Sequence, residues 1–159
     1  PADSVSPGLG LAVPIEFAVA DAADVFAYAL YLEFDPAMLQ VVDADPRPTA
    51  PGVQVRVGDY IDPTSMSIVR NKVDNERGVV EVAVSATYPS VGASGAGVLA
   101  SANFRTIGAG TSELHFEDVA LYKDAFPELE RMPVGWEGGS VTVAGSRYLI
   151  YAPITRANQ

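Results

Sequence analysis

Apolar and polar residues alternate with a period of two along most of the chain. In FAYALYLEF, Phe26, Tyr28, Leu30, Leu32 and Phe34 fall on one face. Successive residues of a β-strand point to opposite sides of a sheet, so this pattern predicts a strand with one buried face. The same alternation recurs in VPIEFAV (13–19), VQVRV (53–57), VVEVAVSA (79–86), VLASANF (98–104), ELHF (113–116) and SVTV (140–143).

Turn-forming residues separate these segments. They occur at Asp35-Pro36, at 50–52, from Asp74 to Gly78, in SVGASGAG (90–97) and in GAG (108–110). Many short alternating strands separated by turns are typical of an all-β sandwich or barrel, in which two antiparallel sheets share one core. No long helix is expected, and only DAADVFA (21–27) and DPAML (35–39) would allow a short one.

The dipeptide Asp35-Pro36 ends the strand in FAYALYLEF. Proline lacks the N–H that a sheet requires, and it disfavours helical geometry at the residue before it. The chain is therefore expected to turn a corner at this point. Met38 and Leu39 then fold back and close the end of the core.

Composition narrows the class of protein. The chain has 159 residues, of which 48% are hydrophobic and 19% charged, as expected for one globular domain. It contains no cysteine, which excludes disulfides and thiolate chemistry. Its formal net charge is -10, which disfavours a nucleic-acid partner. No apolar run approaches the ~18 residues of a membrane span. The start at Pro1, without a methionine, is expected for a trimmed piece, so the absence of a visible signal peptide does not exclude a targeting segment.

Candidate catalytic residues are few. The only histidine is His115, which faces away from Leu114 and Phe116, with Ser112 three residues before it. No G-x-S-x-G motif accompanies them. Carboxylate pairs that would suit glycoside hydrolysis occur at Glu128/Glu130, Glu117/Asp118 and Asp43/Asp45, but in turns or at strand ends. A protein that is not an enzyme is the favoured interpretation.

Acidic loops and scattered aromatic residues raise two further kinds of site, for calcium and for sugars. Oxygen-rich loops occur at Asp43/Asp45, Asp59/Asp62 and 74–76; none matches an EF-hand, and a structural calcium ion at one of them is left open. Sugar binding usually needs a row of exposed aromatic residues. The single Trp136 and the tyrosines Tyr31, Tyr60, Tyr88 and Tyr122 do not assemble into such a row, although carbohydrate binding is retained as an alternative.

Four segments, in order, resemble the cohesin family. These are AYALYLEFDPAMLQVVDA with its Asp-Pro corner, NERGVVEVAVSA, SGAGVLASANFRTIGAGTSELHFEDVALYK and WEGGSVTVAG. The resemblance implies a jelly-roll sandwich of about nine strands over residues 1–145. It also implies a secreted or cell-surface binding module without catalysis, in an assembly linked to polysaccharide degradation. The implied partner is a dockerin-type protein module, which carries the calcium; no cofactor is implied for this module itself.

In cohesins one sheet supplies the dockerin-binding face, and here it is expected to contain 53–60, 67–73, 79–86 and 113–122. Arg56 and Tyr60 are the residue types that dominate many interfaces, whereas the small Ala83 and Ser85 would let a helix approach closely. The outward residues, and so the expected partner-binding residues, are Arg56, Tyr60, Val69, Asn71, Ala83, Ser85, His115 and Tyr122. A structural module of a surface or adhesive protein is a further alternative.

The tail SRYLIYAPITRANQ (146–159) lies beyond the resemblance. Its apolar run is interrupted by Pro153 and is too short to span a membrane. It is expected to add an edge strand, to be a processed sorting tail, or to pack against this or another copy of the domain.

Overall fold

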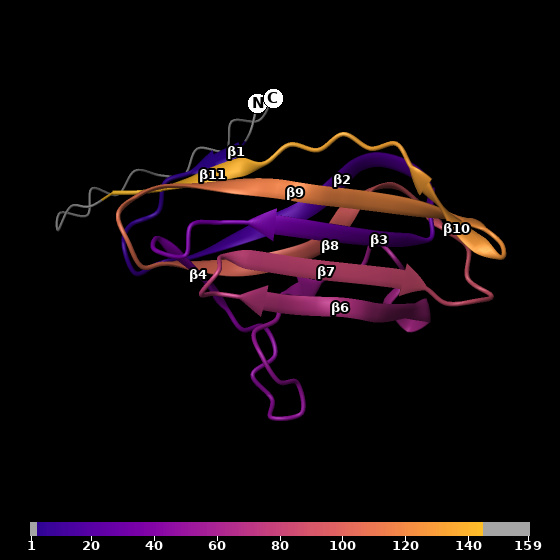
Figure 1. Cartoon of the computed structure of the whole chain (residues 1–159), viewed down its shortest axis with the longest axis horizontal. Coiled ribbons are helices and arrows are strands. Elements are labelled where there is room, and N and C mark those ends of the chain that lie inside the picture. The colour runs from indigo at the N-terminus through magenta and orange to yellow at the C-terminus, as the bar shows by residue number, and fades with distance from the viewer. Residues whose placement is uncertain (1–2, 145–159) are drawn as a thin grey trace.

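The computed structural model describes residues 3–144, which form two β-sheets packed face to face (Figure 1). The strands are β1 (Asp3–Val5), β2 (Ala12–Val25), β3 (Ala27–Glu33), β4 (Leu39–Val42), β5 (Arg56–Val57), β6 (Met66–Asp74), β7 (Val79–Ala86), β8 (Ala93–Thr106), β9 (Gly110–Ala125), β10 (Glu128–Met132) and β11 (Gly139–Val143). A 3-10 turn, η1, spans Pro63–Ser65. The predicted all-β sandwich is confirmed.

The larger sheet has seven strands in the order β1-β11-β9-β3-β7-β6, with β10 also paired to β9. The smaller sheet has the order β2-β8-β4, with β5 paired to β8. Neighbouring strands are antiparallel except β1 and β11, which run parallel. In Figure 1 the seven-stranded sheet lies in front, and β2 and β8 cross behind it.

The core lies between the two sheets, and the predicted alternation supplies its inner layers. Leu30 and Leu32 of β3 and Val82 of β7 are buried. Among the contacts that tie the sheets together, the Phe34 and Phe104 rings lie 5.2 Å apart in an edge-to-face arrangement, and the buried Tyr28 hydroxyl donates to the Leu99 carbonyl at 2.6 Å.

The Asp-Pro corner forms as predicted. After β3 ends, the Asp35 carbonyl accepts hydrogen bonds from the amides of Met38 and Leu39, and its carboxylate accepts one from Ala37. Met38 and Leu39 are both buried, so they close this end of the core. The buried Ser112 hydroxyl accepts a hydrogen bond from the Asp35 amide, which fixes the corner against β9.

One structural expectation was wrong, and neither of the two segments that would allow a short helix forms one. Residues 21–27 are extended through the end of β2 into β3, and residues 36–38 form a turn that leads into β4, so neither segment is a helix. Residues 53–60 do not form one strand of the larger sheet. Val53 bridges Val73 of β6, after which β5 pairs with β8 in the smaller sheet. The segment therefore passes from one sheet to the other. The tail at 146–159 lies outside the described residues.

Candidate functional site

The outward side of β6, β7, β3 and β9 is a continuous surface, called here the docking face. Directly opposed residues of antiparallel strands lie on the same side of a sheet. The strand registers therefore define rows of side chains across it. From one end to the other the rows are Ser67–Ser85–Ala27–Tyr122, Arg70–Ala83–Ala29–Ala120, Lys72–Glu81–Tyr31–Asp118 and Asp74–Val79–Glu33–His115.

Small side chains fill the middle of this face. Ala83, Ala29 and Ala120 lie side by side on three adjacent strands, and they are called here the alanine row. Ala83 and Ala29 are half-buried, whereas Ala120 is only 1% exposed. Tyr122 borders the row on one side and Tyr31 on the other, and both tyrosines are half-buried. The result is a low central strip with larger side chains at its borders, into which a helix or extended segment of another molecule can pack closely.

Half of the predicted binding residues lie on the docking face. Ala83, Ser85, His115 and Tyr122 face outward, as the alternation predicted. Val69 is 69% exposed and sits at a register shift in β6, the edge strand. That these five residues contact a partner stays a prediction.

Arg56 and Tyr60 do not lie on this face, which corrects the prediction for both. Arg56 is exposed on β5, in the smaller sheet. Tyr60 is only 8% exposed, and its ring lies against Gly97 of β8. The predicted location was wrong because 53–60 crosses between the sheets. Truncating Tyr60 would disturb the core, so such a variant would not test binding.

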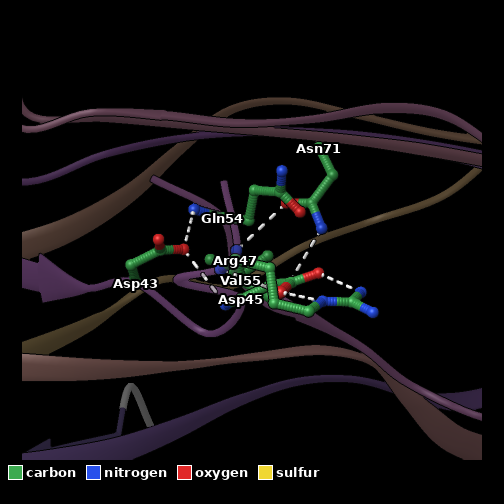
Figure 2. A network of polar contacts seen from close by, with 6 residues as sticks. All are labelled: Asp43, Asp45, Arg47, Gln54, Val55 and Asn71. Carbon is green, nitrogen blue, oxygen red and sulfur yellow. Dashed lines mark hydrogen bonds and ion pairs between the residues drawn. The ribbon is translucent and has the colours of Figure 1, made fainter. Parts of the chain in front are cut away.

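Asn71 also departs from the prediction, because it points to the inner side of β6. The register shift between Ile68 and Arg70 inserts one extra residue, which reverses the phase of the strand beyond it. The Asn71 amide accepts a hydrogen bond from Val55 N at 3.0 Å and donates one to Val55 O at 2.8 Å (Figure 2). Asn71 therefore holds the crossing segment against the sheet and is unavailable to a partner.

The charges of the docking face are largely arranged in pairs. Arg70 contacts Glu81 at 2.5 Å, and Arg131 of β10 contacts Asp118 at 2.7 Å. His115 lies 3.6 Å from Glu117, a pair that is ionic only when the imidazole is protonated. These pairs are solvent-exposed, so each contributes little to stability. They can exchange partners when another charged surface approaches.

Several residues of this face were missed by the sequence reasoning: Ala29, Ala120, Tyr31, Asp118 and Arg131. The alternation in FAYALYLEF already places Ala29 and Tyr31 outward. What the sequence lacked was the register that brings Ala120 and Asp118 beside them, because pairing joins strands far apart in the chain.

The candidate catalytic pair does not form. Ser112 points inward and is buried at the Asp35 corner, whereas His115 is exposed on the outer side of β9. Among residues 3–144 no group of three or more histidine or acidic side chains is arranged to hold a metal ion. This part of the chain also has no helix of the length and apolarity that a membrane span requires.

The loop carboxylates have local structural roles. Asp43 accepts hydrogen bonds from Asp45 N and Gln54 N, and Asp45 binds the Arg47 guanidinium (Figure 2). The hydrogen bonds from Arg47 lower the pKa of Asp45. Asp62 accepts from Thr64 N at the start of η1, which lowers the pKa of Asp62. Each of these carboxylates therefore stabilises the loop to which it belongs.

Within the described residues, the exposed aromatic side chains do not make a flat strip. Trp136 is 43% exposed, donates its indole N–H to Phe116 O at 3.0 Å, and lines a shallow pocket of about 450 Å³ with Arg131. Tyr88 and Phe126 are exposed elsewhere, with ring planes at 86° to one another. A protein surface that binds a flat polysaccharide would require coplanar aromatic rings.

Comparison with known proteins agrees with this architecture. A family model described as the cohesin domain matches residues 1–126. No curated protein sequence matches the chain. A type II cohesin domain from the cellulosome of Acetivibrio cellulolyticus superposes with a TM-score of 0.68 at 16% identity, over 87% of this chain and 90% of that one.

Two further solved structures are similarly close. A cohesin of Acetivibrio cellulolyticus in complex with a dockerin gives a TM-score of 0.67 at 16% identity, over 90% of this chain and 95% of that chain. A non-cellulosomal cohesin from the archaeon Archaeoglobus fulgidus gives 0.65 at 16% identity, over 90% and 87%. At such identities the likeness shows the fold alone. The family match covers most of the sequence, and the chain belongs to the cohesin domain family.

Proposed function

We propose that this domain is a non-catalytic module that binds a dockerin-type partner through its docking face. The observation that carries the proposal is the alanine row at the centre of the face. Alanine is poorly suited to the middle of a sheet, because strands favour β-branched and aromatic residues. Ala83 and Ala29 are the accessible members of the row, and they leave room for the backbone of a partner helix, as in a helix-in-groove interface.

The surroundings of the alanine row support the same interpretation. Tyr31 and Tyr122 flank it, and tyrosine is a residue type enriched at the energetic centre of interfaces. Arg70–Glu81 and Arg131–Asp118 lie further out, where polar pairs form the rim of many interfaces. A stable complex would cover about 800 Å² on each partner.

The calcium in such a complex belongs, in this proposal, to the loops of the partner. The carboxylates of Asp43, Asp45 and Asp62 are engaged with amide and guanidinium groups of this domain. We infer that the module works outside the cell or at its surface, in an assembly that acts on polysaccharides. Two alternatives remain if the test below finds no dockerin-type partner: carbohydrate binding by this module itself, and a structural role in a surface protein.

The test is a pull-down from the secreted proteins of the source organism, with this domain as bait, in calcium and in a calcium chelator. The wild-type domain is compared with Ala83→Arg, which places a large cation in the alanine row. The matched control is Ala18→Arg, the same change on the exposed side of β2 in the smaller sheet. Both variants change exposed or half-exposed positions, so both are expected to remain folded.

We expect the wild type and Ala18→Arg to retain a protein with paired EF-type loops in calcium only, and Ala83→Arg to retain none. Loss of binding in both variants would point away from the docking face. If no protein is retained in either condition, the dockerin proposal fails, and binding to insoluble polysaccharide becomes the next measurement.

A further inference from the structure

Two exposed aromatic side chains, Tyr88 and Phe126, stand at one end of the docking face; they are called here the aromatic pair. Phe126 is 79% exposed and Tyr88 is 58% exposed. Their ring centroids are 6.2 Å apart in an edge-to-face arrangement. Phe126 lies in the turn between β9 and β10, and Tyr88 follows β7. Large exposed apolar side chains that contact one another commonly mark interaction sites.

The aromatic pair is held in a fixed arrangement by Asp124. One carboxylate oxygen of Asp124 accepts the Tyr88 hydroxyl at 2.5 Å and the Phe126 amide at 3.1 Å. The hydrogen bond from the hydroxyl raises the pKa of Tyr88, so the phenol stays neutral and keeps donating. Because two loops distant in sequence are joined in this way, little conformational entropy remains to be lost when another molecule packs on the rings.

Closing the core does not require the aromatic pair. Phe26 already fills this end of the sandwich and is 3% exposed, and the Tyr88 ring packs against it with a centroid distance of 5.2 Å and a tilt of 39°. Phe126 contacts Tyr88 and is the more exposed of the two. An aromatic ring left in water on top of a completed core contributes little to folding, so its presence calls for another explanation.

The aromatic pair is continuous with the docking face. Asp124 follows Tyr122 by two residues, and Tyr88 follows Ser85 by three; both Tyr122 and Ser85 belong to the first row of the face. The opposite end carries exposed carboxylates at Glu33 and Glu117. From Ala27 to Glu33 the face measures about 20 Å, which a helix of about 13 residues spans. The face thus has one apolar end and one acidic end.

We propose that the aromatic pair binds a large aliphatic or aromatic side chain at one end of the partner's helix, while basic residues of the same helix meet Glu33 and Glu117. This inference rests on the proposed function and adds to it the chemistry and direction of the partner. The small side chains of the alanine row set how closely the helix approaches. The apolar end and the acidic end of the docking face determine the direction in which the helix lies.

The experiment measures the affinity of this domain for each dockerin-type module encoded in the source genome, produced singly and loaded with calcium. The domain is used as wild type, Phe126→Ala, Phe126→Leu, Ala83→Arg and Leu9→Ala. Leu9 is a matched control, because it is 54% exposed at the opposite end of the sandwich. Thermal unfolding of each variant checks that the fold is retained.

We expect Phe126→Ala to weaken binding about tenfold, Phe126→Leu to weaken it less, and Leu9→Ala to leave it unchanged. Truncating one large apolar side chain of the partner helix should then weaken wild-type binding but add little to Phe126→Ala. If Ala83→Arg abolishes binding and Phe126→Ala leaves it intact, the aromatic pair is not a contact and the docking face stands. An equal loss in Leu9→Ala also overturns the inference. If no module binds the wild type, the proposed function fails and this inference fails with it.

Discussion

The two sides of β3 and β7 are built from alternate residues of the same strands and differ in the size and polarity of their side chains, although Ala27 and Val79 of the outer side are also buried. On the inner side Leu32, Val80 and Val84 are completely buried in the shared core. On the outer side Ala29, Ala83 and Glu81 are half-exposed, small or charged. The inner side is what a sheet needs to fold, since apolar burial is the main source of stability.

The outer side is less favourable to the fold than it could be. A central strand gains stability from β-branched and aromatic cross-strand pairs, and the alanine row provides none. A sequence selected only for stability would place threonine or valine there. The comparison therefore teaches that the inner side specifies the sandwich, while the outer side keeps a small-residue surface at some cost in stability. Substitutions on the two sides should then have effects of different size and opposite sign.

The largest effect is expected from truncating the inner side at the corner. Phe34→Ala removes a buried ring that packs edge-to-face against Phe104, and leaves a cavity between the sheets. The free energy of unfolding should fall by about 3–5 kcal/mol. Urea denaturation measures this directly. Phe34→Leu, which fills most of the space, should lose clearly less. An equal loss in both variants would contradict the cavity explanation.

A smaller, pH-dependent effect is expected at Tyr28. Tyr28→Phe removes the buried hydrogen bond to the Leu99 carbonyl, which still accepts one from Gly58 N at 2.8 Å. At neutral pH the free energy of unfolding should fall by about 0.5–1.5 kcal/mol. Burial raises the pKa of Tyr28 above its ordinary value. The stability that the neutral phenol provides is therefore complete below a pH of about 10 and declines above it.

The measurement is a pair of urea titrations, of the wild type and of Tyr28→Phe, between neutral pH and pH about 11. Because the variant has no ionisable group at this position, the difference in free energy of unfolding should shrink as the pH passes the ordinary tyrosine pKa. A difference that stays constant across the range would mean that Tyr28 is not protected from ionisation in the folded protein.

How far the sequence could predict this molecule depends on whether a feature is local. The period of two is local, so the inner residues of β3 and β7 and the Asp-Pro corner were predicted correctly. Residues 53–60 carry the same period and yet divide between the sheets, because Val53 pairs with Val73 while β5 pairs with β8. Pairing partners distant in sequence leave no mark on the pattern of a single segment.

The docking face shows the same limit more sharply. One extra residue near Val69 reverses the phase of β6, so Asn71, which alternation placed outside, holds Val55 on the inside. A one-residue shift exchanges the two sides of a strand. The sequence also could not show that the three alanines form a row. Ala83 was expected outside, but its alignment with Ala29 and Ala120 depends on two strand registers.

The smallest effect is expected at the centre of the outer side, and it has the opposite sign. Ala29→Thr places a β-branched residue between Ala83 and Ala120. The free energy of unfolding should rise by up to about 1 kcal/mol, because threonine suits a central strand better than alanine. The same change should weaken binding of a partner helix, since the added atoms occupy the space that the alanine row leaves open. Urea denaturation and titration with a calcium-loaded dockerin-type module test both effects on one variant. A domain that is less stable and binds equally well would show that the alanine row is required by the fold, and the contrast between the two sides would then lose its functional meaning.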